Sequence, residues 1–242
     1  MGRYKVGTDT GERSNQQTGR EPRDRRLENG GPVALLDGFF QNTRKPEGLG
    51  GRMMLDIMNG GAHEKLATWA LDQLAFAGDE QMLDLGCGGG ANLARLLAKA
   101  PEGTATGADY SPASVEKSRE VNAQAIAEGR CQVVEADVAE LPFADDAYDL
   151  VTAFETIYFW PQMEKSLAEA WRVVKPGGRF AIINEEDGLH EKTTEWSGRI
   201  DGMRVYTPDQ LEQLLRGAGF SDVRIIETPD PSYNWIIFEA RK

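Results

Sequence analysis

The stretch "QMLDLGCGGGANLARLLA" at residues 81–98 decides the fold, because it places a glycine-rich turn between two apolar runs of different character. The run before the turn has the length of a buried strand, and the alanine- and leucine-rich run after it has helical spacing. Glycine at 86, 88, 89 and 90 allows the backbone to approach a ligand, and the following helix N-terminus attracts negative charge. The stretch alone leaves two interpretations open, a nucleotide-binding loop and a tight turn without a ligand.

The rest of the chain repeats this alternation of strand-like and helical segments. Strands are expected at 81–86, 104–109, 131–137, 147–155 and 179–186, and helices at 63–76, 91–100, 111–129, 162–174 and 207–219. Two final strands, 222–228 and 234–240, are separated by too few residues for a crossover helix and must form an antiparallel hairpin. We therefore predict an α/β, Rossmann-like fold. Its seven-stranded sheet is mostly parallel, has helices on both faces and ends in the antiparallel hairpin.

Composition sets the domain organisation and the class of partner. We expect residues 1–30, which are polar and mildly basic, to be a disordered or appended tail, 31–62 to be an N-terminal helical lid, and 63–242 to be a single domain. The net charge of −12 argues against a nucleic acid as the main partner, and no apolar run is long enough for a membrane span. Two cysteines fit a reducing cytoplasm, and a wide separation between the two histidines argues against a structural zinc site, so no metal is expected.

Two cofactors compete for the glycine loop. Gly86-x-Gly88-x-x-Ala91 satisfies the dinucleotide pattern, and Asp109 ends the next strand, where an acid would hold ribose hydroxyls, so NAD is one interpretation. Asp84 lies two residues before the first glycine, near the end of its strand. A carboxylate there suits a ligand that carries a cationic amine and is unfavourable beside a pyrophosphate.

Several segments taken together resemble the class I S-adenosylmethionine-dependent methyltransferases, in particular their small-molecule branch. Asp84-x-Gly86-x-Gly88-x-Gly90 is similar to the first motif of that family, and "GADYSPASVEKSRE" to its second. "EADVAELPFADDAYDLV" and "AEAWRVVKPGGRFAIIN" are similar to its later segments, and the terminal hairpin is what that fold adds to a Rossmann-like sheet. The resemblance covers roughly residues 60–242 in the family's order and implies S-adenosylmethionine as cofactor, with S-adenosylhomocysteine as product.

The resemblance also implies roles for individual residues around the cofactor. Main chain at Gly86, Cys87 and Gly88 would pass close to the methionine moiety, and Asp84 would lie near its α-amino group. Asp109 would accept from both ribose hydroxyls, since a carboxylate offers two oxygens. The remaining expected contacts are Tyr110 along the adenine face, Asp137 and Val138 at the adenine edge, and Phe154 near the methionine moiety.

The acceptor site is expected where loops follow the fourth and fifth parallel strands. Glu155 and Tyr158 follow the fourth strand, and His63 stands at the start of a helix; these three are the candidate catalytic residues. Phe159 and Trp160 are equally well explained by packing under the next helix. The insert after the fifth strand, residues 184–206, is the expected source of acceptor specificity, and Arg52, Met53 or Met54 is expected to approach the cofactor from the lid.

The sequence thus predicts a cytoplasmic enzyme, monomeric or homodimeric, that transfers a methyl group to a small-molecule metabolite. An in-line displacement on a sulfonium depends mainly on alignment, and a general base is required only when the acceptor must lose a proton. Two alternatives stay open at this point: a sensor that binds S-adenosylmethionine without turnover, and an NAD-dependent oxidoreductase.

Overall fold

The computed structural model describes residues 46, 48–190, 200 and 202–242. The expected tail at 1–30, most of the segment 31–47, and the part of the insert at 191–199 lie outside the described residues. Within the described ranges, no helix has the length and apolar character needed to cross a membrane.

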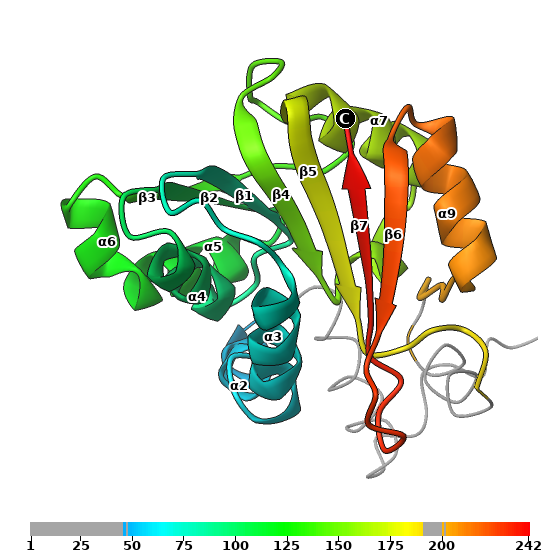
Figure 1. Ribbon diagram of the computed structural model, residues 1–242. Coiled ribbons are helices and arrows are strands. Elements are labelled where there is room, and N and C mark those ends of the chain that lie inside the picture. Colours follow the sequence, from blue (N-terminus) through cyan, green and yellow to red (C-terminus); the bar gives the residue numbers. More distant parts are fainter. Residues whose placement is uncertain (1–45, 47, 191–199, 201) are drawn as a thin grey trace, which may run out of the picture.

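A seven-stranded sheet forms the centre of the molecule, in the order β3-β2-β1-β4-β5-β7-β6 (Figure 1). The pairs among β1 to β5 are parallel, whereas β7 pairs antiparallel with both β5 and β6. This confirms the predicted mostly parallel sheet with its terminal hairpin. The strand bounds are β1 Gln81–Leu85, β2 Thr104–Asp109, β3 Cys131–Glu135, β4 Tyr148–Phe154, β5 Val174–Asn184, β6 Ser221–Glu227 and β7 Ile236–Arg241.

Helices cover both faces of the sheet, and α5 and α9 begin with side-chain caps. Ser111 caps its helix by accepting from the Ser114 amide, and Thr207 forms a capping box with Gln210. In both helices proline follows the cap, where its missing amide hydrogen costs nothing. The helix bounds are α2 Gly48–Met58, α3 Gly61–Gln73, α4 Ala91–Lys99, α5 Pro112–Val121, α6 Ala123–Ala127, α7 Met163–Val173 and α9 Pro208–Gly217, with a 3₁₀ turn at Ile157–Phe159.

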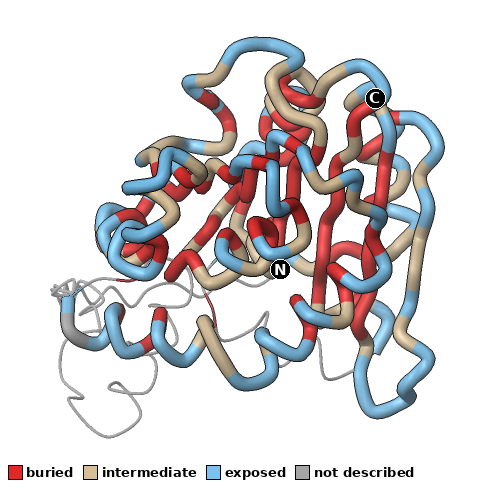
Figure 2. Tube along the Cα trace, turned by 60° about the vertical axis from the view of Figure 1, so that its left-hand side comes forward, coloured by how far each residue is buried: buried red, intermediate tan, exposed pale blue. Residues whose placement is uncertain are grey.

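Alternation along the strands divides the core into two clusters, one on each face of the sheet. In β1, Leu83 and Leu85 belong to the cluster that includes α7 and α9, whereas Met82 belongs to the one that includes α3 and α4. Figure 2 shows the central strands buried and the outer surfaces of the helices exposed. Because successive side chains enter opposite cores, a shift of one residue in register would exchange the two sets.

Two of the expected boundaries were wrong. The helix expected at 111–129 is interrupted at Asn122, whose side-chain amide donates to the Gly90 carbonyl at 2.9 Å and so ties the end of α5 to the glycine loop. The strand expected from 179 begins at Val174, which pairs with Tyr148 across a bulge, so the "KPGG" segment belongs to β5.

The carboxyl ends of the parallel strands meet at one edge of the sheet, and α2 and α3 lie at this end of the molecule (Figure 1). The turn between these two helices is attached to the glycine loop: the Asn59 side chain donates to the Gly89 carbonyl at 3.1 Å, and Arg95 donates to the Asn59 carbonyl at 3.1 Å. A site at this edge is therefore framed by the loops of the sheet and by the N-terminal helices.

Candidate functional site at the carboxyl edge of the sheet

The glycine loop has the backbone conformation for which glycine is needed. Gly86, Gly88 and Gly90 have φ angles of 72°, 51° and 82°, in the left-handed region. A Cβ at Gly86 would overlap the Thr156 side chain, so this glycine permits close packing of the β1 and β4 loops. At Gly88, by contrast, a Cβ would meet nothing within 4 Å, which leaves its backbone open to a ligand.

Asp109 links the loop to the end of β2. Its two carboxylate oxygens accept from the Gly88 and Ser111 amides, both at 2.9 Å. Burial raises the pKa of this carboxyl, while the two amide hydrogen bonds act in the opposite direction. The carboxylate is thus fixed beside the glycine loop, where the sequence places a ribose-binding acid.

A cleft runs along this edge, and the predicted cofactor residues line it. It contains about 940 Å³ of free space, its open mouth included. Seven of the nine predicted residues line it: Gly86, Gly88, Asp109, Tyr110, Asp137, Val138 and Phe154. Cys87 lines an adjoining pocket that shares Gly86, Gly88 and Phe154 with the cleft.

Asp84 lies below the cleft and does not line it. The side chain is 1% exposed, and it accepts a hydrogen bond from the Thr152 hydroxyl at 2.8 Å. Burial raises its pKa to about 7, opposed by the Thr152 hydrogen bond and assisted by the negative charge of Asp109. Asp84 is therefore a buried acid next to the loop, in a position to act on a ligand through the loop or through water.

The shape and chemistry of the cleft fit a nucleoside that carries an amino-acid chain. Asp109 supplies a two-oxygen acceptor at a sugar position, and Val138 and Phe154 supply apolar surface. Asp137 is partly committed, because its Oδ1 accepts from the Ala139 amide at 2.9 Å. Asp137 also lines the cleft, and the sequence predicts it at the adenine edge.

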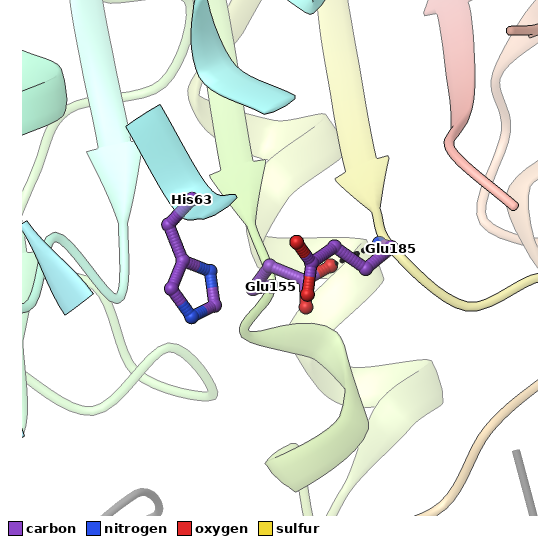
Figure 3. Close-up of side chains that lie close together, drawn as sticks. All are labelled: His63, Glu155 and Glu185. Atoms are coloured by element: carbon purple, nitrogen blue, oxygen red, sulfur yellow. Dashed lines mark hydrogen bonds between the residues drawn. The ribbon is translucent and has the colours of Figure 1, made fainter. Parts of the chain in front are cut away.

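The candidate catalytic residues gather at the ends of β4 and β5. His63 from α3, Glu155 after β4 and Glu185 after β5 each offer a ligand atom, and these atoms all lie within 4.8 Å of one another (Figure 3). Glu155 and His63 line the pocket next to the glycine loop. Glu155 has a φ of 55°, an uncommon conformation for a residue other than glycine, asparagine or aspartate.

Hydrogen bonds fix the Glu155 carboxylate. Its Oε1 accepts from the Tyr158 hydroxyl at 3.1 Å and from the Glu185 amide, and the same hydroxyl accepts from the Glu186 amide at 3.2 Å. Tyr158 is 2% exposed and lies behind Glu155, outside the lining of the cleft. Burial, followed by the charge of Glu185, raises the pKa of Glu155 well above its usual range.

The structure also brings in residues that the sequence did not single out for this site. Glu185 was expected only as part of the insert, and Leu55 and Met58 of α2 line the cleft in place of the expected Arg52, Met53 or Met54. Arg52 instead pairs with Glu120 of α5 at 2.9 Å. Leu55 and Met58 are three residues apart, so they lie on the same face of α2. This spacing could have predicted which face of the helix lines the cleft.

Residues 83–182 match the methyltransferase domain family. The chain is 30% identical over 151 residues to a ubiquinone/menaquinone biosynthesis C-methyltransferase of Dinoroseobacter shibae, covering 62% of this chain and 59% of that protein. It is 35% identical over 169 residues to 27-O-demethylrifamycin SV methyltransferase of Amycolatopsis mediterranei, covering 64% and 61%.

The match thus spans about three fifths of the length of these curated relatives. Among solved structures, a SAM-dependent methyltransferase from Aquifex aeolicus superposes with a TM-score of 0.65 at 20% identity, covering 78% of this chain and 97% of that chain. The domain match includes the glycine loop. The shared fold agrees with the sheet and its terminal hairpin. The chain carries a methyltransferase domain at residues 83–182, and it is similar in sequence to small-molecule methyltransferases and in fold to a SAM-dependent methyltransferase.

Proposed function

We propose that this protein transfers a methyl group from S-adenosylmethionine to a small-molecule acceptor bound beside Glu155. The observation that carries the proposal is the cleft itself, which is lined by Gly88, Asp109, Phe154 and Glu155. A cofactor lying along it would extend from the end of β2 toward the end of β4.

Each cofactor contact has a physical reason in this arrangement. Asp109 holds the ribose hydroxyls, and the Gly88 backbone, free of a side chain, admits the methionine moiety. Tyr110 and Val138 enclose the adenine, and Asp137 accepts from its amino group. Asp84 favours the α-amino group by charge, with Thr152 orienting its carboxylate.

When bound, the cofactor supplies an electrophilic methyl group on a good leaving group. The chain then needs to align the acceptor with that methyl group and to exclude water. Glu155 and His63 line the pocket from β4 and α3, and Tyr158 holds Glu155 from behind. Phe159 and Trp160 extend the apolar wall of the cleft, which suits an acceptor with an apolar part.

The relatives support the class of acceptor. One is named as a C-methyltransferase of quinone biosynthesis and another as a methyltransferase of a rifamycin, both of them acting on small molecules. We extend this class to the present chain, together with a cytoplasmic location, which the two free cysteines fit, and a monomeric or homodimeric state without a nucleic-acid partner. The division at residue 31 between tail and lid, and at 63 between lid and catalytic domain, is part of the same proposal.

Calorimetry and a transfer assay test the function separately. S-adenosylmethionine and S-adenosylhomocysteine should bind with one-to-one stoichiometry and NAD should not, and label should pass from methyl-labelled cofactor into a metabolite extract. Binding of NAD without binding of S-adenosylhomocysteine would refute the proposal in favour of an oxidoreductase. Cofactor binding with no transfer to any fraction of the extract would favour the sensor.

A further inference from the structure

The cluster of His63, Glu155 and Glu185 has a composition that methyl transfer by alignment does not require. One imidazole and two carboxylates come from three separate segments, α3 and the loops after β4 and β5, and converge within 4.8 Å (Figure 3). Each of the three side chains is half-buried. Ligand atoms bound to one ion at about 2.1 Å lie at most about 4.2 Å apart, so small side-chain movements would bring all three onto a single ion.

His63 offsets part of the negative charge at Glu185. Among the described residues, no lysine or arginine forms an ion pair with Glu155 or Glu185. Two carboxylates held close together in a half-buried site are costly without a cation. His63 supplies a ring nitrogen beside them, which a neutral imidazole can use as a metal ligand.

The surroundings orient the side chains as the outer shell of a metal site does. The Tyr158 hydroxyl and the Glu185 amide both donate to one oxygen of Glu155, and the second oxygen carries no hydrogen bond within the described residues. Hydrogen bonds of this kind fix a ligating carboxylate and tune its basicity. His63 is positioned by the α2–α3 turn, which Asn59 attaches to the glycine loop.

We propose that His63, Glu155 and Glu185 form a binding site for one divalent transition-metal ion, whose open coordination positions face the cleft. A mixed imidazole and carboxylate set suits Zn²⁺, Fe²⁺ or Mn²⁺ better than Mg²⁺, which prefers oxygen ligands and retains its water. The proposal rests on the proposed function in one respect. In the acceptor pocket, the ion would select acceptors that present a coordinating oxygen or nitrogen next to the methylated atom.

Metal titration tests the site independently of methyl transfer. The full chain, stripped with a chelator, is titrated calorimetrically with Zn²⁺ and with Mg²⁺, and Co²⁺ is followed by its visible absorption. We expect one Zn²⁺ per chain, and a Co²⁺ spectrum without a thiolate charge-transfer band. Mg²⁺ should bind at least 100-fold more weakly than Zn²⁺.

His63→Ala and Glu185→Gln should each weaken Zn²⁺ binding at least 100-fold, while His190→Ala provides the matched control. His190 is the other histidine of the chain and pairs with Asp187 at 3.0 Å, outside the cluster. Cooperative urea unfolding of each variant shows that its fold is intact. If the variants no longer unfold cooperatively, displacement of bound Co²⁺ from the wild-type chain by Zn²⁺ replaces them. Stoichiometric loss of the Co²⁺ visible absorption is the expected result.

Four results would overturn the metal proposal: no binding of Zn²⁺ by the wild-type chain, unchanged affinity in both variants, loss of binding in His190→Ala, or a thiolate band with Co²⁺. Binding of methylammonium at the cluster with no response to Zn²⁺ would overturn it as well and assign the site to a cationic amine acceptor. Failure of the metal proposal leaves cofactor binding and transfer untouched. Failure of the proposed function would appear instead as absent binding of S-adenosylhomocysteine.

Discussion

Replacement of Asp84 by asparagine should stabilise the cofactor-free protein at alkaline pH. The carboxyl is buried, and its pKa rises from the ordinary 3.8 to about 7. Between these two values the unfolded chain has released the proton and the folded chain retains it, so the free energy of unfolding decreases as the pH rises. Asparagine keeps the shape and an acceptor for the Thr152 hydroxyl, but it has no charge to bury.

The expected size follows from the two pKa values. A carboxyl with these pKa values lowers the free energy of unfolding by about 2.5 kcal/mol between pH 5 and pH 8. The slope is about 1.4 kcal/mol per pH unit while the pH lies between the two pKa values. Asp84→Asn should therefore gain about 2.5 kcal/mol over the wild-type chain in moving from pH 5 to pH 8. For a domain of this size, that corresponds to roughly 5–10 °C in Tm.

Urea unfolding of the cofactor-free protein at both pH values measures this double difference. Asp222→Asn, at an exposed position, is the control for removing one surface carboxylate. The reasoning fails if the stability difference between Asp84→Asn and wild type is the same at pH 5 and pH 8. The same variant should bind S-adenosylmethionine about 10- to 100-fold more weakly, since it loses one charged hydrogen-bond acceptor.

Three further changes test the neighbouring residues. Thr152→Val removes the hydrogen bond that lowers the pKa of Asp84, so the pH-dependent loss of stability should extend to higher pH; an unmoved unfolding profile would contradict this. Asp109→Ala should abolish cofactor binding in calorimetry, and unchanged affinity would mean that the end of β2 is misassigned. Gly90→Ala should destabilise the fold by about 2–4 kcal/mol, because its φ is 82° and a Cβ would lie 2.7 Å from the backbone of α5. Gly60→Ala, with open space around it, should be nearly neutral in the same urea assay.

The fold, and the residues that line the cleft, were accessible from sequence because their signals are local. The glycine loop, the acid at Asp109 and the alternation of strand and helix are each contained within a few residues, and the short link before β7 forces an antiparallel pairing. The break at Asn122 was missed because its cause is a tertiary hydrogen bond to Gly90, which no period within residues 111–129 reveals.

The cluster of His63, Glu155 and Glu185 was less accessible because it depends on convergence between distant segments. His63 and Glu155 were singled out separately, but the sequence offered no reason to place them beside Glu185. The expectation of no metal rested on the spacing of histidines along the chain, whereas the proposed site needs a single histidine and two glutamates from different loops. Convergence at the edge of a parallel sheet is a property of topology, and spacing rules do not detect it.

Buried carboxyls at this edge impose a cost that folding alone does not explain. Asp84, Asp109 and Glu155 all have raised pKa values because burial disfavours their charge, and no lysine or arginine is among the described residues that line the cleft. Neutral side chains of the same shape would make the cofactor-free fold more stable. Acids in such positions suit a ligand that arrives with positive charge, such as the amino group and sulfonium of S-adenosylmethionine. In that case each variant that removes one of these acids should bind its ligand more weakly and have a higher free energy of unfolding. A variant in which both the affinity and the free energy of unfolding decrease would argue for a purely structural role.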